Sequence, residues 1–109
     1  METISVTPVV LRLGILSVEP YEKYKQMTTE ERRKSCQIVQ SIRDLLKDIV
    51  INVPYTPTIG SYINILEFKD YFNFTKEQID FLEDKLYKIE GIFLYKDHLD
   101  ICIKLFTSF

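Results

Sequence analysis

His98 is the only histidine of the chain, and the sequence places it between two aspartates. Asp97 or Asp100 could orient its imidazole so that the ring acts as a general base. The same residues are typical of a polar turn, where aspartate and its neighbours favour tight backbone conformations. Because no Ser or Cys nucleophile is suggested beside His98, we predict a turn and no catalytic residue, and a protein that is not an enzyme.

Metal and cofactor chemistry has few candidate residues. Asp80, Glu83 and Asp84 share one face of a predicted helix and could hold Mg²⁺ through two carboxylates, although a solvated helix face gives the same pattern. The two cysteines, Cys36 and Cys102, lie too far apart in the sequence for a zinc ribbon, and the three glycines are isolated from one another. We therefore predict no metal site, no cofactor and two free thiols.

Aromatic residues are abundant, with seven Tyr and seven Phe in 109 residues, and several fall outside the predicted buried stripes. Exposed aromatic side chains are typical of protein interfaces, whereas the alternative is that connectors pack them back onto the domain. The predicted partner interface consists of Tyr21, Tyr24, Tyr55, Phe81, Asp84 and Tyr87. The first functional hypothesis is a non-catalytic protein-interaction module or a small accessory subunit, with a protein partner or self-association.

One basic cluster supports a second hypothesis, in which the protein is a winged-helix-type nucleic-acid-binding protein that uses this cluster and the C-terminal hairpin predicted over 92–106. The cluster consists of Lys23, Lys25, Arg32, Arg33 and Lys34 and is interleaved with tyrosines, as in surfaces that stack bases and contact phosphates. The alternative is a solvated surface whose charge is offset by neighbouring glutamates. The net charge of −2, from 14 basic and 16 acidic residues, disfavours nucleic acid or an anionic membrane as the main partner.

Two amphipathic helices are predicted to position these residues. The first runs over about 28–50 and begins at a capping box formed by Thr28 and Glu31. The second runs over 75–89 and begins at a similar box formed by Thr75 and Gln78. Gly91 is placed to end this helix in a left-handed conformation.

Strands are predicted at both ends of the chain. Ile92–Tyr95 and Leu99–Phe106 form a hairpin (92–106) joined near Lys96–His98, and the second strand alternates between apolar and polar residues. The apolar run Ile4–Val18 suits a buried strand, with a short helix begun by Thr7 and Pro8 as the alternative. Asn52–Gly60 is predicted to be an irregular connection.

The segment 62–72 fits two interpretations, because Ile63 and Ile65 alternate as in a strand while Ile65, Phe68 and Phe72 fit a helical stripe. With a helix here, residues 65–106 resemble the core of a winged helix-turn-helix domain, on apolar spacing alone. The resemblance implies a DNA-contacting second helix. The helix predicted there carries more carboxylates than lysines and no arginine, so we expect it to face a protein instead.

Together these patterns predict one α+β domain over 1–109, with the two helices packed on a small, mostly antiparallel sheet. The apolar run near the N-terminus is interrupted by Pro8, Arg12 and Gly14, which is unlike a membrane span or a signal peptide. With two unpaired cysteines, a cytoplasmic location and no membrane association are expected.

Overall fold

The apolar run near the N-terminus forms strand β1, Thr7–Leu13, in the computed structural model, which describes residues 6–14 and 18–108. Val9, Leu11 and Leu13 of this strand are buried. The strand interpretation is therefore confirmed for the described part of the run. Residues 4, 5 and 15–17 of the run are not among the described residues.

The first long helix, α2, spans Thr29–Leu46 and begins at the predicted capping box. The Glu31 amide donates to Thr28 Oγ1 (3.1 Å), and the Thr28 amide donates to Glu31 Oε1 (3.0 Å). The helix ends before the predicted residue 50, because the chain turns into strand β2, Ile51–Val53, which pairs with β1. Strand β2 overlaps the start of the predicted irregular connection, and the short helix α1, Tyr21–Tyr24, lies where no helix or strand is predicted.

The ambiguous segment 62–72 contains both kinds of structure. Strand β3, Tyr62–Ile63, comes first, and the 3₁₀ helix η1, Ile65–Tyr71, follows. Asn64 begins η1, and its side chain accepts a hydrogen bond from the Leu66 amide (3.0 Å). The strand and helix interpretations therefore each describe one part of the segment.

The helix predicted over 75–89 is wrong in its second half. Helix α3, Lys76–Leu82, begins at the capping box of Thr75 and Gln78 as predicted, but strand β4 spans Lys85–Leu94. Ile89 fits the predicted helical stripe, but it also fits the alternation of a strand, in which Lys85, Tyr87 and Ile89 are buried. These residues form a strand because β4 pairs with β5 from Lys85 to Leu94. The predicted left-handed Gly91 is likewise wrong, because Gly60 is the glycine with positive φ (92°) among the described residues.

The five strands form one sheet in the order β2-β1-β5-β4-β3. Strand β5, Leu99–Ser108, is antiparallel to β4, which confirms the predicted hairpin and extends it. It also pairs in parallel with β1, with Val9 opposite Leu99 and Leu13 opposite Ile103. The other strand pairs are antiparallel, so the fold is the predicted α+β class with a mixed, mostly antiparallel sheet.

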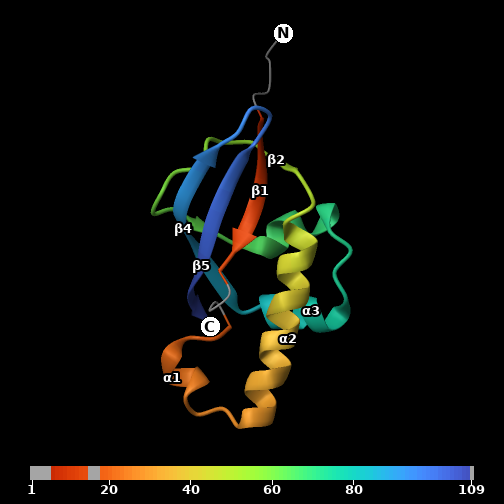
Figure 1. The fold of residues 1–109 in the computed structure, drawn as a ribbon, viewed down its shortest axis with the longest axis vertical. Coiled ribbons are helices and arrows are strands. Elements are labelled where there is room, and N and C mark those ends of the chain that lie inside the picture. Colours follow the sequence, from red (N-terminus) through yellow and green to blue (C-terminus); the bar gives the residue numbers. More distant parts are fainter. Residues whose placement is uncertain (1–5, 15–17, 109) are drawn as a thin grey trace.

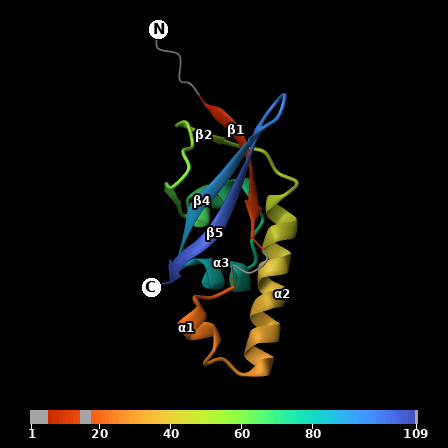
Figure 2. The ribbon, with the colours of Figure 1, turned by 60° about the vertical axis from the view of Figure 1, so that its left-hand side comes forward.

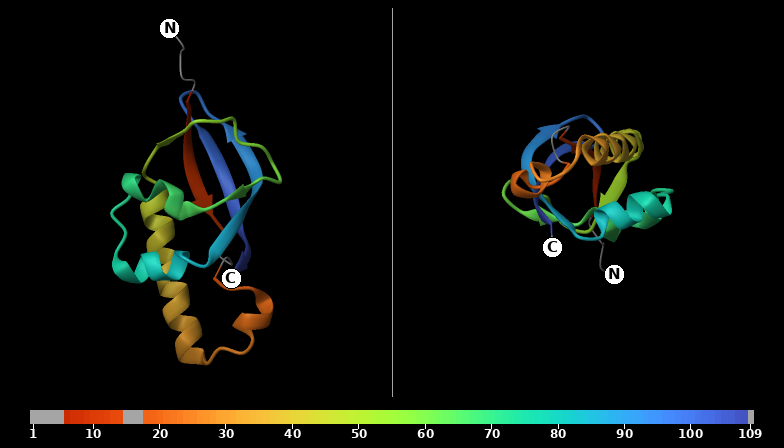
Figure 3. Two further views of the ribbon diagram at one scale, coloured as in Figure 1. Left: turned by 180° about the vertical axis from the view of Figure 1, so that it is seen from behind. Right: turned by 90° about the horizontal axis from the view of Figure 1, so that it is seen from below.

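The sheet curls, and its inner face carries the hydrophobic core. Ile89 from β4 and Ile101 and Ile103 from β5 are buried there, and α2 adds Ile42 and Leu46. Seen along the long axis, α2 and α3 lie on the same side of the curled strands (Figure 3). The turn of the β4–β5 hairpin lies at one end of the molecule, and α1 with the start of α2 lies at the other (Figure 1). No helix in the described part of the chain has the length and apolar character needed to cross a membrane.

Candidate functional site

His98 lies at the hairpin turn and bonds to carboxylates through both ring nitrogens. Nδ1 lies 2.8 Å from Asp97 Oδ1, and Nε2 lies 3.1 Å from Asp100 Oδ1. Asp100, which is buried, also accepts a hydrogen bond from Arg12 Nε on β1 (3.0 Å). Both ring nitrogens therefore face carboxylate oxygens, and through Asp100 and Arg12 this arrangement joins the hairpin turn to β1.

The neighbouring thiol of Cys102 is poorly suited to nucleophilic chemistry. Partial burial raises its pKa, and Asp100 adds to this effect. The thiol therefore stays protonated at neutral pH, whereas the thiolate is the reactive form. Cys36 and Cys102 are both free, as predicted.

The carboxylates considered for Mg²⁺ are either exposed or paired with a lysine. Asp80 and Glu83 are exposed, and Asp84 lies beyond the end of α3, where its Oδ1 is 3.1 Å from Lys85 Nζ. Within residues 6–14 and 18–108, no group of three His, Cys, Asp or Glu side chains is arranged to hold a metal ion.

The predicted partner interface is scattered over the molecule. Tyr21 is 75% exposed and Tyr55 is also exposed, whereas Tyr24 is half-buried and packs against the core. The expectation that Phe81 and Tyr87 are exposed is wrong, because both side chains are buried: Phe81 faces inward from α3, and Tyr87 lies on the inner face of β4 rather than on a helix surface. Contact of the exposed tyrosines with a partner stays a prediction.

The most exposed apolar run lies instead at the end of β4. Phe93, Leu94 and Tyr95 are consecutive and are 57%, 84% and 52% exposed. The hairpin that carries them projects beyond the end of the sheet (Figure 2). The sequence signal was present, since residues 92–95 are four apolar residues without the polar alternation of a half-solvated strand.

One edge of β4 is free beside this run. In the described chain, β3 pairs with β4 only at Tyr87 and Lys88, and the preceding loop adds hydrogen bonds at Ile89. The Tyr95 amide donates to the His98 carbonyl (3.0 Å), toward β5. Because hydrogen-bonding directions alternate along a strand, the backbone groups of Ile92 and Leu94 point to the opposite, unpaired edge.

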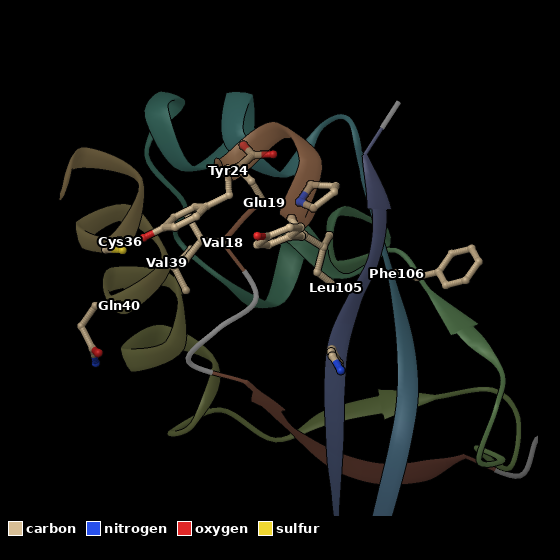
Figure 4. Close-up of a pocket in the computed structure, with 11 residues that line it drawn as sticks. Val18, Glu19, Tyr24, Cys36, Val39, Gln40, Leu105 and Phe106 are labelled. Carbon is tan, nitrogen blue, oxygen red and sulfur yellow. The ribbon is translucent and has the colours of Figure 1, made fainter. Parts of the chain in front are cut away.

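A largely apolar pocket of about 690 Å³ lies between α1, α2 and β5. Tyr24 extends from α1 toward Cys36 and Val39 of α2, and Leu105 faces them from β5 (Figure 4). The Phe106 ring points to the other side of β5, where it contacts the Tyr62 ring with centroids 4.8 Å apart. Sequence reasoning missed this pocket, because no helix is predicted over Tyr21–Tyr24.

A buried group of charges lies next to the pocket. The Lys85 side chain is 2% exposed, and its Nζ lies 2.8 Å from the Phe81 carbonyl and 3.1 Å from both Asp84 Oδ1 and Glu19 Oε1. These three oxygens match the three N–H donors of the ammonium, and the Phe81 ring lies 3.7 Å away. The buried position of Lys85 is tolerated because the charge of its ammonium group is fully paired.

The basic cluster predicted for nucleic acid lies on α1 and the first turns of α2. Lys23 pairs with Glu19 (3.3 Å), Lys25 with Glu22 (2.7 Å) and Arg33 with Glu30 (3.6 Å). Arg32 donates instead to the carbonyls of Tyr24 and Lys25. Lys34 is exposed. The cluster and the hairpin turn lie at opposite ends of the molecule (Figure 1), so one compact ligand does not reach both.

Comparison with known proteins gives no match, either to a family model, to a curated protein or to a solved structure. The functional proposals below are therefore based on the geometry of the chain.

Proposed function

We propose that this protein is a non-catalytic interaction module that binds a protein partner through the tip of the β4–β5 hairpin and the free edge of β4. The observation that carries the proposal is the consecutive exposure of Phe93, Leu94 and Tyr95. Contiguous apolar surface at a projecting position is a feature of interaction sites, and aromatic side chains supply much of the binding energy in such interfaces.

The free edge indicates how the partner binds. Edge strands are normally protected by charged side chains, proline or a very short length. The residues Gly91–Leu94 carry neither charge nor proline, and the strand that they end is ten residues long. An extended segment of a partner can add to such an edge through backbone hydrogen bonds, with apolar contacts from Phe93 and Leu94.

Selection of extended peptides on the wild-type protein tests this proposal. Leu94→Pro removes the outward N–H without removing a bond to β5, so we expect it to weaken peptide binding by roughly tenfold or more. Ile59→Ala is the matched control, because Ile59 is equally apolar and is 67% exposed at a different site. In the wild type, bound peptide should slow hydrogen exchange at the Leu94 amide. Peptides that bind Leu94→Pro as tightly as the wild type would contradict the proposal.

A further inference from the structure

The outer strands of the sheet cover little of its edges. Strand β2 has three residues and β3 has two, and such short edge strands offer little backbone to another chain. Strand β4 is ten residues long, and in the described chain β3 pairs with it only at Tyr87 and Lys88. An added strand would therefore pair with β4 at Ile92 and Leu94, whose backbone groups point away from β5.

This segment of β4 is complementary to itself in an antiparallel arrangement. When Phe93 lies opposite Phe93 of a second copy, Ile92 lies opposite Leu94 of that copy. Both residues direct their N–H and C=O groups outward, so each of the two equivalent pairs exchanges two hydrogen bonds. A shift by one residue removes this match, and a shift by two keeps only one such pair. The symmetric register about Phe93 is therefore the one that uses both residues fully.

The charges at the two ends of the segment match in the same register. Glu90 lies opposite Lys96 of the second copy, and two-fold symmetry forms this pair of opposite charges twice. Lys96 is exposed at the hairpin turn, and Glu90, which is 54% exposed, lies at the long distance of 3.8 Å from Lys104 Nζ. The other charge at the turn, Asp97, is already paired with His98 (2.8 Å).

The exposed apolar side chains are covered by the same pairing. Phe93 lies on the two-fold axis, where antiparallel strands hold opposite Cα atoms about 4.5 Å apart, and its ring packs against that of the second copy. Such aromatic cross-strand pairs stabilise sheets. Tyr95 lies opposite Gly91 of the second copy, which has no side chain to obstruct the ring. Leu94, which is 84% exposed, lies opposite Ile92 of the second copy.

We infer that the partner at the β4 edge is a second copy of this chain, in a two-fold dimer that joins two sheets through antiparallel β4 strands. This inference rests on the interaction proposed at that edge and names its partner. The dimer is closed, because both copies use the same edge. Helices α1 and α3 lie away from the hairpin tip and leave room for the second copy (Figure 1). A contact confined to residues 90–96 is small, so we expect a dissociation constant of roughly 10 µM to 1 mM.

Light scattering of the wild-type protein from about 10 µM to about 1 mM tests association. We expect a reversible change from monomer to dimer. Leu94→Pro should weaken it by roughly tenfold or more, and Ile59→Ala, at an exposed apolar residue elsewhere, should leave it unchanged. A wild type that stays monomeric would overturn the inference. If extended peptides bind that monomer, the interaction proposed at the β4 edge holds with another partner, and if they do not, both proposals are wrong.

Charge reversal tests the register. Glu90→Lys and Lys96→Glu each place like charges opposite each other twice in the dimer, so each should raise the dissociation constant by roughly three- to tenfold. The double variant restores opposite charges and should return the constant to within about threefold of the wild-type value. Single variants without effect, or a double variant without recovery, would overturn the inference.

Disulfide formation locates the two-fold axis. Phe93→Cys places two thiols across the axis at a Cα separation that a disulfide spans, whereas Leu94→Cys places the Cα atoms about 8 Å apart. In a glutathione redox buffer we expect linked dimers of Phe93→Cys and far fewer of Leu94→Cys. Mass spectrometry identifies the linked residues, because Cys36 and Cys102 are also free. Equal linkage of the two variants would contradict the register and with it the proposed dimer.

Discussion

Buried polar side chains distinguish this core at the scale of single residues. Lys85 is fully paired, but the hydroxyl of Tyr87 is buried and has no hydrogen-bond partner among the described residues. Burial raises the pKa of the Tyr87 phenol above its ordinary value of 10.0, and the charges of Glu19 and Asp84 raise it further. The hydroxyl is therefore a cost to stability, whereas the ring fills the core.

Replacement of Tyr87 by Phe should keep or increase stability at neutral pH, by up to about 1 kcal/mol, because it removes an unsatisfied hydroxyl. The folded protein holds the phenol proton more tightly than the unfolded chain, so the wild type loses stability as pH rises above about 10. Tyr87→Phe should reduce that loss. Urea unfolding at neutral and alkaline pH measures both effects, with the exposed Tyr21→Phe as control. A loss of more than 1 kcal/mol at neutral pH would indicate a bonded hydroxyl.

At the scale of elements, the glycine with a left-handed backbone lies in the turn before the edge strand β3. Gly60 has a φ of 92°, and its amide donates to the Ile89 carbonyl (2.8 Å). Gly91 lies within β4 opposite Cys102. A left-handed backbone therefore requires glycine at residue 60. It does not require glycine at residue 91, where the sequence analysis predicts a left-handed residue.

Gly60→Ala should destabilise the protein by about 1–2 kcal/mol, because an L side chain strains the left-handed region. Gly91→Ala is the matched comparison, since its Cβ would lie 3.5 Å from Phe93 and 3.7 Å from Cys102, which are ordinary contacts. We expect its free energy of unfolding to stay within about 0.5 kcal/mol of the wild type or to rise slightly. Chemical denaturation of both variants checks this, and a larger cost at residue 91 would restore the left-handed interpretation.

At the scale of the whole molecule, the surfaces that belong to the two functional hypotheses lie apart. The apolar hairpin tip and the basic cluster on α1 and α2 are at opposite ends (Figure 1). Most of the cluster's side chains are bound to glutamates or to backbone carbonyls, and the net charge is −2. Nucleic-acid binding stays the second hypothesis. It differs from protein binding in the retention on heparin that it predicts.

We expect the protein to elute from heparin below physiological salt, because three of the five basic side chains of the cluster are paired with glutamates and the net charge is −2. Stepwise elution with sodium chloride measures this. Glu22→Gln frees Lys25 and should increase retention slightly, which shows that the assay responds to the cluster. Strong retention of the wild type that falls steeply with salt would favour the nucleic-acid hypothesis over the protein interface.

Local features could be predicted from the sequence because they depend on neighbouring residues. The capping boxes of Thr28 and Thr75 and the hairpin turn near His98 are formed within a few residues, and all are present in the structure. The amphipathic pattern likewise determined the α+β class. These elements obey short-range rules for backbone hydrogen bonds and turns.

Long-range pairing was decided only by the tertiary structure. Residues 85–89 fit both a helical and a strand period, and pairing with β5 determined the strand. That strand buries Tyr87 and Lys85, and Glu19, 66 positions before Lys85, supplies the counter-charge. The parallel pairing of β1 with β5 joins residues about 90 positions apart, such as Val9 and Leu99. The free edge of β4 and the pocket beside Glu19 follow from these contacts, whose energies depend on burial and not on local sequence.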